Sequence, residues 1–134
     1  MNIAVLDACA MIAYLRNEAG ADIVERLLND PLIVCYSHSI NLLEVYYDGL
    51  RHGSATDARA ALATLKTDGV LTRRNMSEAF LRSVGALKAR GRLSLADCFC
   101  IALTQAMGGD LYTSDHHEFD RLVPLGLCSI VFIR

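Results

Sequence analysis

The sequence lacks any long apolar segment. Its longest uncharged runs, such as PLIVCYSHSINLL, are shorter than the roughly 18 apolar residues that a membrane-spanning helix needs. The N-terminus also lacks the basic region and the small-residue cleavage site of a secretory signal. Hydrophobic residues make up 53% of the chain, which excludes a disordered protein. Together these features predict a cytoplasmic protein that does not contact a membrane.

Paired cysteine motifs are also missing. The cysteines are odd in number, lie within apolar runs and show no C-x-x-C spacing; they are Cys9, Cys35, Cys98, Cys100 and Cys128. This pattern is typical of buried free thiols in a reducing compartment and disfavours both disulfides and a zinc site.

Several catalytic signatures are absent. The sequence contains neither the G-x-S-x-G of serine hydrolases nor the G-K-[ST] of phosphate-binding loops. An aspartyl phosphatase would need a second Asp two positions after Asp7, where Cys9 stands. A receiver domain would need an acidic pair beside the first strand and a late Lys, and both are missing.

Short apolar runs alternate with helix-like segments along the whole chain. Five runs are expected as strands: residues 2–6, 32–36, 70–74, 110–113 and 129–133. Ser39 and Ser94 are expected as helix N-caps, and Gly53 as a helix stop. This order predicts one α/β domain over residues 1–134, with a mainly parallel central sheet and helices on both faces.

Two aspartates follow predicted strands. Asp7 ends the first strand, and Asp115 comes soon after LYT in the fourth. Because ligands of open α/β sheets collect at the carboxyl ends of strands, these carboxylates are expected at one edge if both strands are central. Each aspartate also fits the simpler role of a helix N-cap.

Two further carboxylates lie on apolar helix faces. Glu44 shares a face with Ile40, Leu43 and Tyr47 that is expected to point inward, and Glu is rarely buried unless it is paired or bound to a cation. Asp97 shares a face with Ile101, although its S-x-x-D spacing also fits a helix cap.

Four carboxylates in such positions predict one acidic pocket, built from Asp7, Glu44, Asp97 and Asp115. Like charges in a pocket raise one another's pKa unless a cation neutralises them. Carboxylate oxygens suit Mg²⁺ or Mn²⁺. Such ions ionise a bound water and offset the charge of a phosphodiester under attack. The set therefore favours metal-dependent phosphodiester hydrolysis.

Basic residues are unevenly distributed in this chain of net charge −2. Residues 66–92 contain seven basic and two acidic side chains, which makes this segment either a phosphate-facing surface or a solvated helix face. The candidates for steering a phosphate backbone are Arg73, Arg74, Lys88, Arg90 and Arg92.

The segment DHHEFD contains adjacent histidines. Adjacent residues point in different directions on a helix, so at most one of His116 and His117 can join a common site. His116 follows Asp115 directly and is a candidate substrate contact, with a surface position as the simpler reading.

Four stretches resemble the PIN-domain ribonucleases, specifically VapC-type toxins of type II toxin–antitoxin systems: VLDACAMIAYL, INLLEVYY, RLSLADCFCIAL and LYTSDHHEF. The resemblance spans essentially the whole chain. It implies a three-layer α/β/α sandwich and an endoribonuclease that cuts RNA, such as tRNA or rRNA. It implies that Mg²⁺ or Mn²⁺ is held by Asp7, Glu44, Asp97 and Asp115. It also implies a homodimer and a cognate antitoxin protein that inserts into the active-site groove.

Two positions near the acidic residues bear on activity. Thr113, in the T-x-D turn, is similar to the family's hydroxyl beside the site. The family usually has Ser or Thr two residues after the first Asp, where this chain has Cys9, a poorer hydrogen-bond partner for water or phosphate. Cys9 therefore keeps an alternative open, a catalytically weak or inactive PIN-like module that binds RNA or a partner protein.

Overall fold

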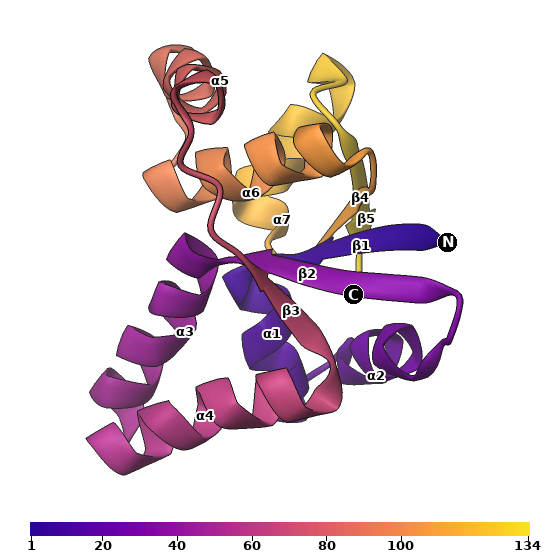
Figure 1. The fold of residues 1–134 in the computed structure, drawn as a ribbon, viewed down its shortest axis with the longest axis vertical. Coiled ribbons are helices and arrows are strands. Elements are labelled where there is room, and N and C mark those ends of the chain that lie inside the picture. The colour runs from indigo at the N-terminus through magenta and orange to yellow at the C-terminus, as the bar shows by residue number, and fades with distance from the viewer.

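The computed structural model describes residues 1–134 and is built on a five-stranded sheet with the order β3-β2-β1-β4-β5 (Figure 1). The strands are β1 (Asn2–Leu6), β2 (Ile33–His38), β3 (Val70–Arg73), β4 (Asp110–Thr113) and β5 (Ser129–Phe132). Every neighbouring pair is parallel. The predicted sheet is confirmed, and its parallel direction places all five carboxyl ends at one edge.

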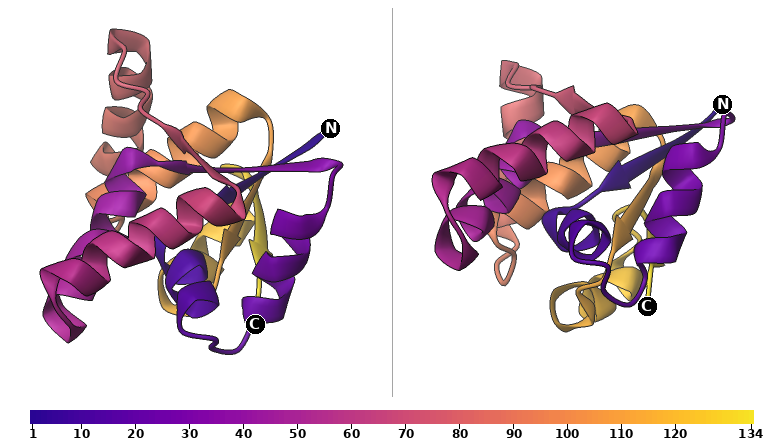
Figure 2. Two further views of the ribbon diagram at one scale, coloured as in Figure 1. Left: turned by 60° about the horizontal axis from the view of Figure 1, so that its bottom comes forward. Right: turned by 90° about the horizontal axis from the view of Figure 1, so that it is seen from below.

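Helices cover both faces of the sheet. The segments are α1 (Ala8–Leu15), α2 (Ala21–Asn29), α3 (Ser39–His52), α4 (Ala55–Asp68), α5 (Glu78–Ala89), α6 (Leu95–Met107), α7 (His116–Phe119) and the 3₁₀ helix η1 (Asp120–Leu125). The first four lie on one face and the others on the opposite face (Figures 1 and 2). The expected three-layer α/β/α arrangement is confirmed.

The apolar pattern of β1 explains the two layers. Successive strand side chains point to opposite faces. Val5 therefore packs into a cluster with α5, α6, α7 and η1. Ala4 and Leu6 pack into the other cluster, with α1 to α4. A strand buried on both faces reads as a continuous apolar run, as NIAVL does.

Two of the three predicted helix boundaries, Ser94 and Gly53, are confirmed. Ser94 accepts a hydrogen bond from the Asp97 N–H at the start of α6. Gly53 follows the last residue of α3. The start of α3 differs from the prediction by one residue, because His38 rather than Ser39 is the N-cap. Its Nδ1 accepts from the Ile40 N–H at 3.1 Å.

The expected inward face of α3 is confirmed at Ile40, which packs against a core cluster, and is wrong at Leu43 and Tyr47. Leu43 is 54% exposed and Tyr47 is 45% exposed, whereas Asn41 and Val45 are buried. The reason is α4, which packs closely against α3 on the side that carries Val45 and Gly49. A Cβ on Gly49 would lie 2.8 Å from the Ala58 Cα, so the two helices approach closely there. Local periodicity could not reveal which side α4 would cover.

All five cysteines are free, as predicted. Cys35, Cys98 and Cys100 are buried, while Cys9 and Cys128 are partly exposed. None of the helices combines the length and the apolarity that crossing a bilayer requires.

Candidate active site

The four carboxylates predicted from the sequence line one pocket of about 160 Å³. Asp7 follows β1 and Asp115 follows the adjacent β4, while Glu44 comes from α3 and Asp97 from α6. Because β1 and β4 are parallel neighbours, the chain leaves both at the same edge of the sheet. We call this the acidic pocket; it is lined by Asp7, Ala8, Cys9, Glu44, Ser94, Asp97, Asp115 and Glu118.

Asp7 is the most deeply buried of the four carboxylates, with 3% of its surface exposed. Its Oδ1 accepts a hydrogen bond from the Ala10 N–H at 2.8 Å, so it is also the N-cap of α1. Burial raises the pKa of Asp7 to about 7, assisted by the charges of Asp97 and Asp115 and opposed by hydrogen bonds with Thr113 and Ala10. The capping role and the place in the pocket are therefore compatible.

A buried amide connects the two helices that carry Glu44 and Asp97. The Asn41 Nδ2 donates to Glu44 Oε1 at 3.4 Å and to the Ala96 carbonyl at 3.1 Å. The Asn41 Oδ1 is buried without a partner. Because both neighbouring atoms are acceptors, the amide must present its NH₂ group to them. Burial raises the pKa of Glu44.

Asp97 and Asp115 are oriented by helix starts. Ser94 Oγ accepts from the Asp97 N–H at 3.0 Å, and Asp115 Oδ1 accepts from the Glu118 N–H at 3.0 Å. Burial raises the pKa of Asp97, and the nearby charges of Glu118 and Asp115 raise it further. Both capping bonds fix the start of a helix beside the acidic pocket.

Cys9 and Thr113 occupy different positions relative to the acidic pocket. Cys9 lines it, and burial together with the surrounding carboxylates raises the pKa of its thiol, which is therefore protonated at neutral pH. Thr113 is fully buried and is not part of the lining; its Oγ1 accepts from the Asp115 N–H at 3.0 Å. Thr113 thus positions the aspartates from behind the pocket.

Two polar lining residues, Ser94 and Glu118, were not predicted as site residues. Ser94 was expected only as a cap, and Glu118 was not singled out. Glu118 stands three positions after Asp115, the spacing that places both side chains on the first turn of α7. That spacing is the signal that could have identified it.

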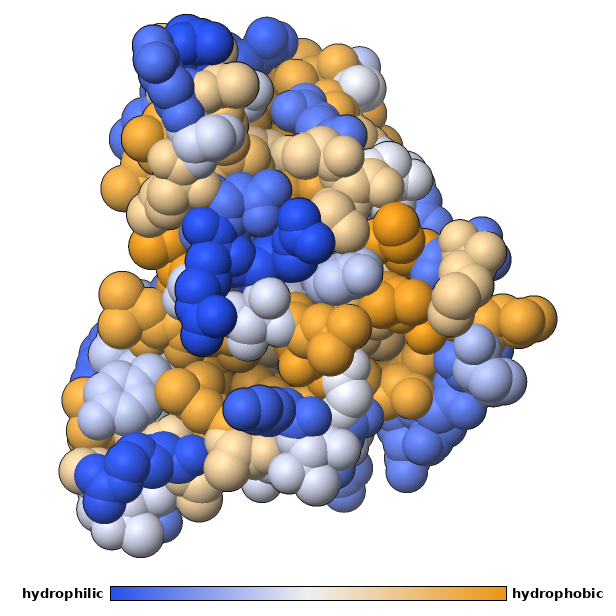
Figure 3. Space-filling view, viewed as in Figure 1, coloured by the Kyte–Doolittle hydropathy of each residue, from blue (hydrophilic) through white to orange (hydrophobic).

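The predicted basic residues do not form one surface, and none of them lines the acidic pocket. Arg73 lies over the Tyr36 ring and Arg74 lines a groove between α3 and α4. This region, where β3 leads toward α5, includes a hydrophilic patch on the face shown in Figure 3. Arg90 and Arg92 line a different pocket beside η1. Lys88 donates from Nζ to the Leu93 carbonyl at 2.6 Å.

His116 is turned away from the acidic pocket. Its Nδ1 is 2.7 Å from Asp120 Oδ1, its Nε2 is 2.6 Å from the Arg134 carbonyl, and its ring stacks on Phe132. Since both ring nitrogens have protein partners, the geometry supports a structural role that anchors the C-terminus, in place of the expected substrate contact. His117 is exposed.

The donor atoms of the acidic pocket fit a hard divalent cation such as Mg²⁺ or Mn²⁺. Burial raises the pKa of Asp7, Glu44 and Asp97, and a cation favours the charged forms instead. No three His, Cys, Asp or Glu side chains are gathered tightly enough to be a ready-made metal site. The fit therefore rests on the donor chemistry and on the shared pocket.

Comparison with known proteins finds the PIN domain over residues 4–123. Among solved structures, VapBC2 from Rickettsia felis, bound to a promoter DNA fragment, matches with a TM-score of 0.75 and 14% identity, covering 97% of this chain and 98% of that one. VapBC-1 from nontypeable Haemophilus influenzae matches with a TM-score of 0.70 and 20% identity, covering 98% of each chain.

A third structure of similar fold is the sarcin–ricin-loop-cleaving toxin VapC20 from Mycobacterium tuberculosis. It matches with a TM-score of 0.66 and 18% identity, covering 90% of this chain and 95% of that one. At these identities the likeness concerns the fold. No curated protein matches the chain by sequence.

Proposed function

The chain belongs to the PIN-domain family, and we propose that it is a Mg²⁺- or Mn²⁺-dependent endoribonuclease, the toxin of a toxin–antitoxin pair. Members of this family are nucleases, and such nucleases generally use divalent metals. One observation carries the proposal: four carboxylates from four separate elements line the same pocket. Structural packing alone does not require this gathering of like charge.

In this proposal Asp7, Glu44, Asp97 and Asp115 hold the divalent ion or ions. The ion supplies positive charge that lowers the pKa of an attacking water and offsets charge on the phosphodiester. The carboxylates also exclude an RNA phosphate electrostatically until a cation balances their charge. Asn41 and Thr113 keep Glu44, Asp7 and Asp115 in place from the interior.

We extend the proposal to the chain's partners. Several structures of similar fold are toxin–antitoxin complexes, which supports a cognate antitoxin for this chain. RNA, in particular tRNA or rRNA, is the proposed substrate. A single domain over residues 1–134, a homodimeric state and a cytoplasmic location complete the proposal.

Cleavage of purified tRNA and rRNA tests the enzyme directly. Incubation with Mg²⁺ or Mn²⁺ is expected to produce cuts at discrete sites, and EDTA or Asp97→Asn is expected to abolish them. Glu25→Gln, an exposed carboxylate change on α2, serves as the matched control and should cut like wild type. A folded Asp97→Asn protein that cuts as fast as wild type would refute the proposal.

Cys9 keeps a second function under consideration, because a thiol occupies the pocket where the family usually has a hydroxyl. That function is a PIN-like module that binds RNA or a protein without cutting. Such a module should retain its RNA affinity in EDTA, and neither RNA should be cut with or without metal.

A further inference from the structure

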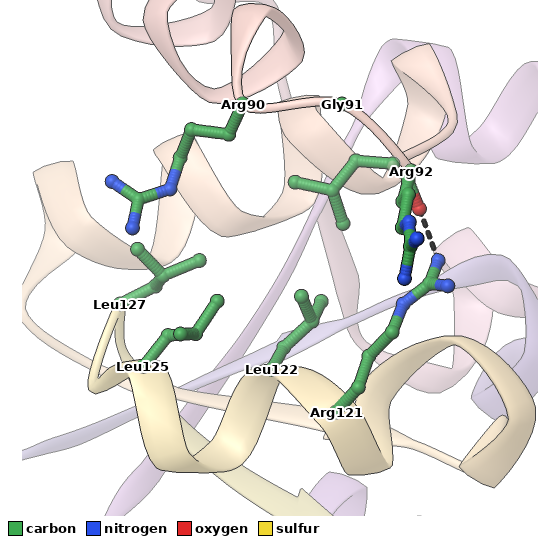
Figure 4. A pocket seen from close by; sticks show the side chains of 8 residues that line it. Arg90, Gly91, Arg92, Arg121, Leu122, Leu125 and Leu127 are labelled. Carbon is green, nitrogen blue, oxygen red and sulfur yellow. Dashed lines mark hydrogen bonds between the residues drawn. The ribbon is translucent and has the colours of Figure 1, made fainter.

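A second pocket, of about 520 Å³, lies between the α5–α6 loop and η1. We call it the arginine–leucine pocket; it is lined by Arg90, Gly91, Arg92, Leu93, Arg121, Leu122, Leu125 and Leu127. No acidic side chain is part of this lining. Figure 4 shows Arg90 at one end, Arg92 and Arg121 at the other, and leucine side chains between them. The pocket thus combines a cationic rim with an apolar floor.

The loop that carries two of the arginines has a defined conformation. Gly91 and Arg92 have φ values of 82° and 65°, and the left-handed region is uncommon for a residue with a side chain. Arg121 donates to the Arg92 carbonyl, and Lys88 Nζ donates to the Leu93 carbonyl. These bonds attach the loop to η1 on one side and to α5 on the other. The backbone that carries Arg90 and Arg92 is therefore held in place.

The arginine–leucine pocket adjoins the acidic pocket. Leu93 lines the former and the next residue, Ser94, lines the latter. Arg121 also forms an ion pair at 2.8 Å with Glu118, which lines the acidic pocket. The two pockets are therefore lined by residues that are adjacent in sequence or in direct contact.

We propose that the arginine–leucine pocket is a nucleotide subsite for single-stranded RNA, in which Arg90 and Arg92 contact a phosphate beside the scissile bond and the leucines contact the attached base. A guanidinium group can donate two parallel hydrogen bonds to the oxygens of one phosphate, and the flat faces of bases pack against apolar surfaces. The volume lies in the range of small-ligand pockets. This inference rests on the proposed nuclease function.

Equilibrium binding tests the subsite. The Asp97→Asn protein, which is expected to bind RNA without cutting it, is titrated with Mg²⁺ present against a labelled single strand of about 12 nucleotides. Adding Arg90→Gln and Arg92→Gln should weaken binding by ~10-fold or more and lower the slope of log K against log salt by about 0.7 for each lost phosphate contact. The matched pair Arg26→Gln and Arg59→Gln, exposed on α2 and α4, should change neither quantity.

Two further variants separate charge from apolar contact. Leu125 is 52% exposed, so Leu125→Ser should weaken binding without unfolding the protein and without changing the salt slope. Arg90→Lys with Arg92→Lys should restore most of the slope, which shows that lost charge and not misfolding weakened the glutamine variant. In wild-type background, the glutamine changes should raise KM for RNA cleavage and leave kcat nearly unchanged.

Specific results would overturn the subsite. One is unchanged affinity and salt slope in the glutamine variant while the Asp97→Asn parent binds the strand; the nuclease proposal would then stand without the subsite. Another is a glutamine variant that no longer binds a synthetic acidic peptide that its parent binds, while its RNA affinity is unchanged. That result would identify a protein as the ligand of this pocket. Absence of both RNA binding by the parent and cleavage by wild type would overturn the nuclease function itself.

Discussion

Asp7 illustrates how one side chain serves both fold and site. Its carboxylate caps α1 through the Ala10 N–H and lines the acidic pocket. The capping bond stabilises the charged form, yet burial dominates and raises the pKa to about 7. The protein therefore holds a carboxyl group whose ionisation is unfavourable in the folded state unless a cation accompanies it.

Asp7→Asn should stabilise the cation-free protein at high pH. An acid whose folded pKa exceeds its unfolded value binds protons more tightly when folded, so the wild-type free energy of unfolding falls as pH rises from about 4 to about 7. Asparagine can keep the cap without this loss. The gain at pH 8 is bounded by the pKa change from 3.8 to about 7, at most ~4 kcal/mol.

Urea unfolding in EDTA at pH 5 and pH 8 measures this effect. The prediction concerns the difference between variant and wild type, because buried His38, whose pKa is lowered by burial, contributes a dependence of opposite sign. The stability difference should widen from pH 5 to pH 8. A difference that is constant with pH would contradict the raised pKa of Asp7.

Cys9→Ser should speed RNA cleavage several-fold. A serine hydroxyl donates and accepts hydrogen bonds more strongly than the protonated Cys9 thiol, so it orients water or phosphate better in the acidic pocket. Initial rates of RNA cleavage at fixed Mg²⁺ measure the change. Cys128→Ser, a partly exposed thiol outside the pocket, is the control and should leave the rate unchanged. Equal or slower cleavage by Cys9→Ser would show that the thiol does not limit activity.

At the scale of elements, the site depends on how α3 and α6 meet. Glu44 and Asp97 come from these two helices, and Asn41 connects them through Glu44 and the Ala96 carbonyl. His38 joins the start of α3 to the Asn75 carbonyl; its ring stacks on Phe80 and packs at a tilt against Phe99. The neutral His38 ring accepts at Nδ1 and donates at Nε2, which is the tautomer these partners require.

Asn41→Ala should lower the free energy of unfolding and raise the Mg²⁺ concentration that cleavage needs. Loss of the buried amide leaves the Ala96 carbonyl without this donor and should cost about 1–3 kcal/mol. Because Glu44 is released as well, half-maximal cleavage should need several-fold more Mg²⁺.

A matched control for Asn41→Ala lies on the same helix. Val45 is also buried, and Val45→Ala should lower stability through lost packing without moving the Mg²⁺ midpoint. Urea unfolding and Mg²⁺ titration of cleavage are measured for both variants. If both shift the Mg²⁺ midpoint equally, Asn41 has only a general structural role.

At the scale of the molecule, parallel strand order is what assembles the acidic pocket. The adjacent carboxyl ends of β1 and β4 place Asp7 and Asp115 side by side, and helices from the two opposite layers bring Glu44 and Asp97 to the same edge. The acidic pocket therefore lies where the three layers meet. For this reason, neutralising its carboxylates should change the stability of the whole domain.

Mg²⁺ should raise the melting temperature, and more so at pH 8 than at pH 6. An ion that binds only the folded chain stabilises it, by about 1.4 kcal/mol at ten times its Kd. Binding requires deprotonated carboxylates, and the raised pKa of Asp7 makes deprotonation less complete at pH 6. Thermal unfolding with and without Mg²⁺ measures both effects. The increase should shrink in Asp97→Asn, and an identical increase there would place the ion elsewhere.

Short-range features of the sequence were enough to predict the order of strands and helices and most of the named helix boundaries. They also identified the four carboxylates as candidate site residues. These features depend on side-chain periodicity and on hydrogen bonds within a few residues, so they can be read without the fold. The family resemblance was equally accessible, because its motifs are contiguous.

Only the tertiary structure decided which faces and which distant residues meet. Leu43 and Tyr47 stay exposed although α4 packs on the same helix. His116 bonds to Asp120 and to the Arg134 carbonyl and does not line the acidic pocket. The path of the chain separated Arg73 from Arg90 and brought Arg121 beside Arg92. These outcomes depend on contacts between segments far apart in sequence, whose partners no local pattern specifies.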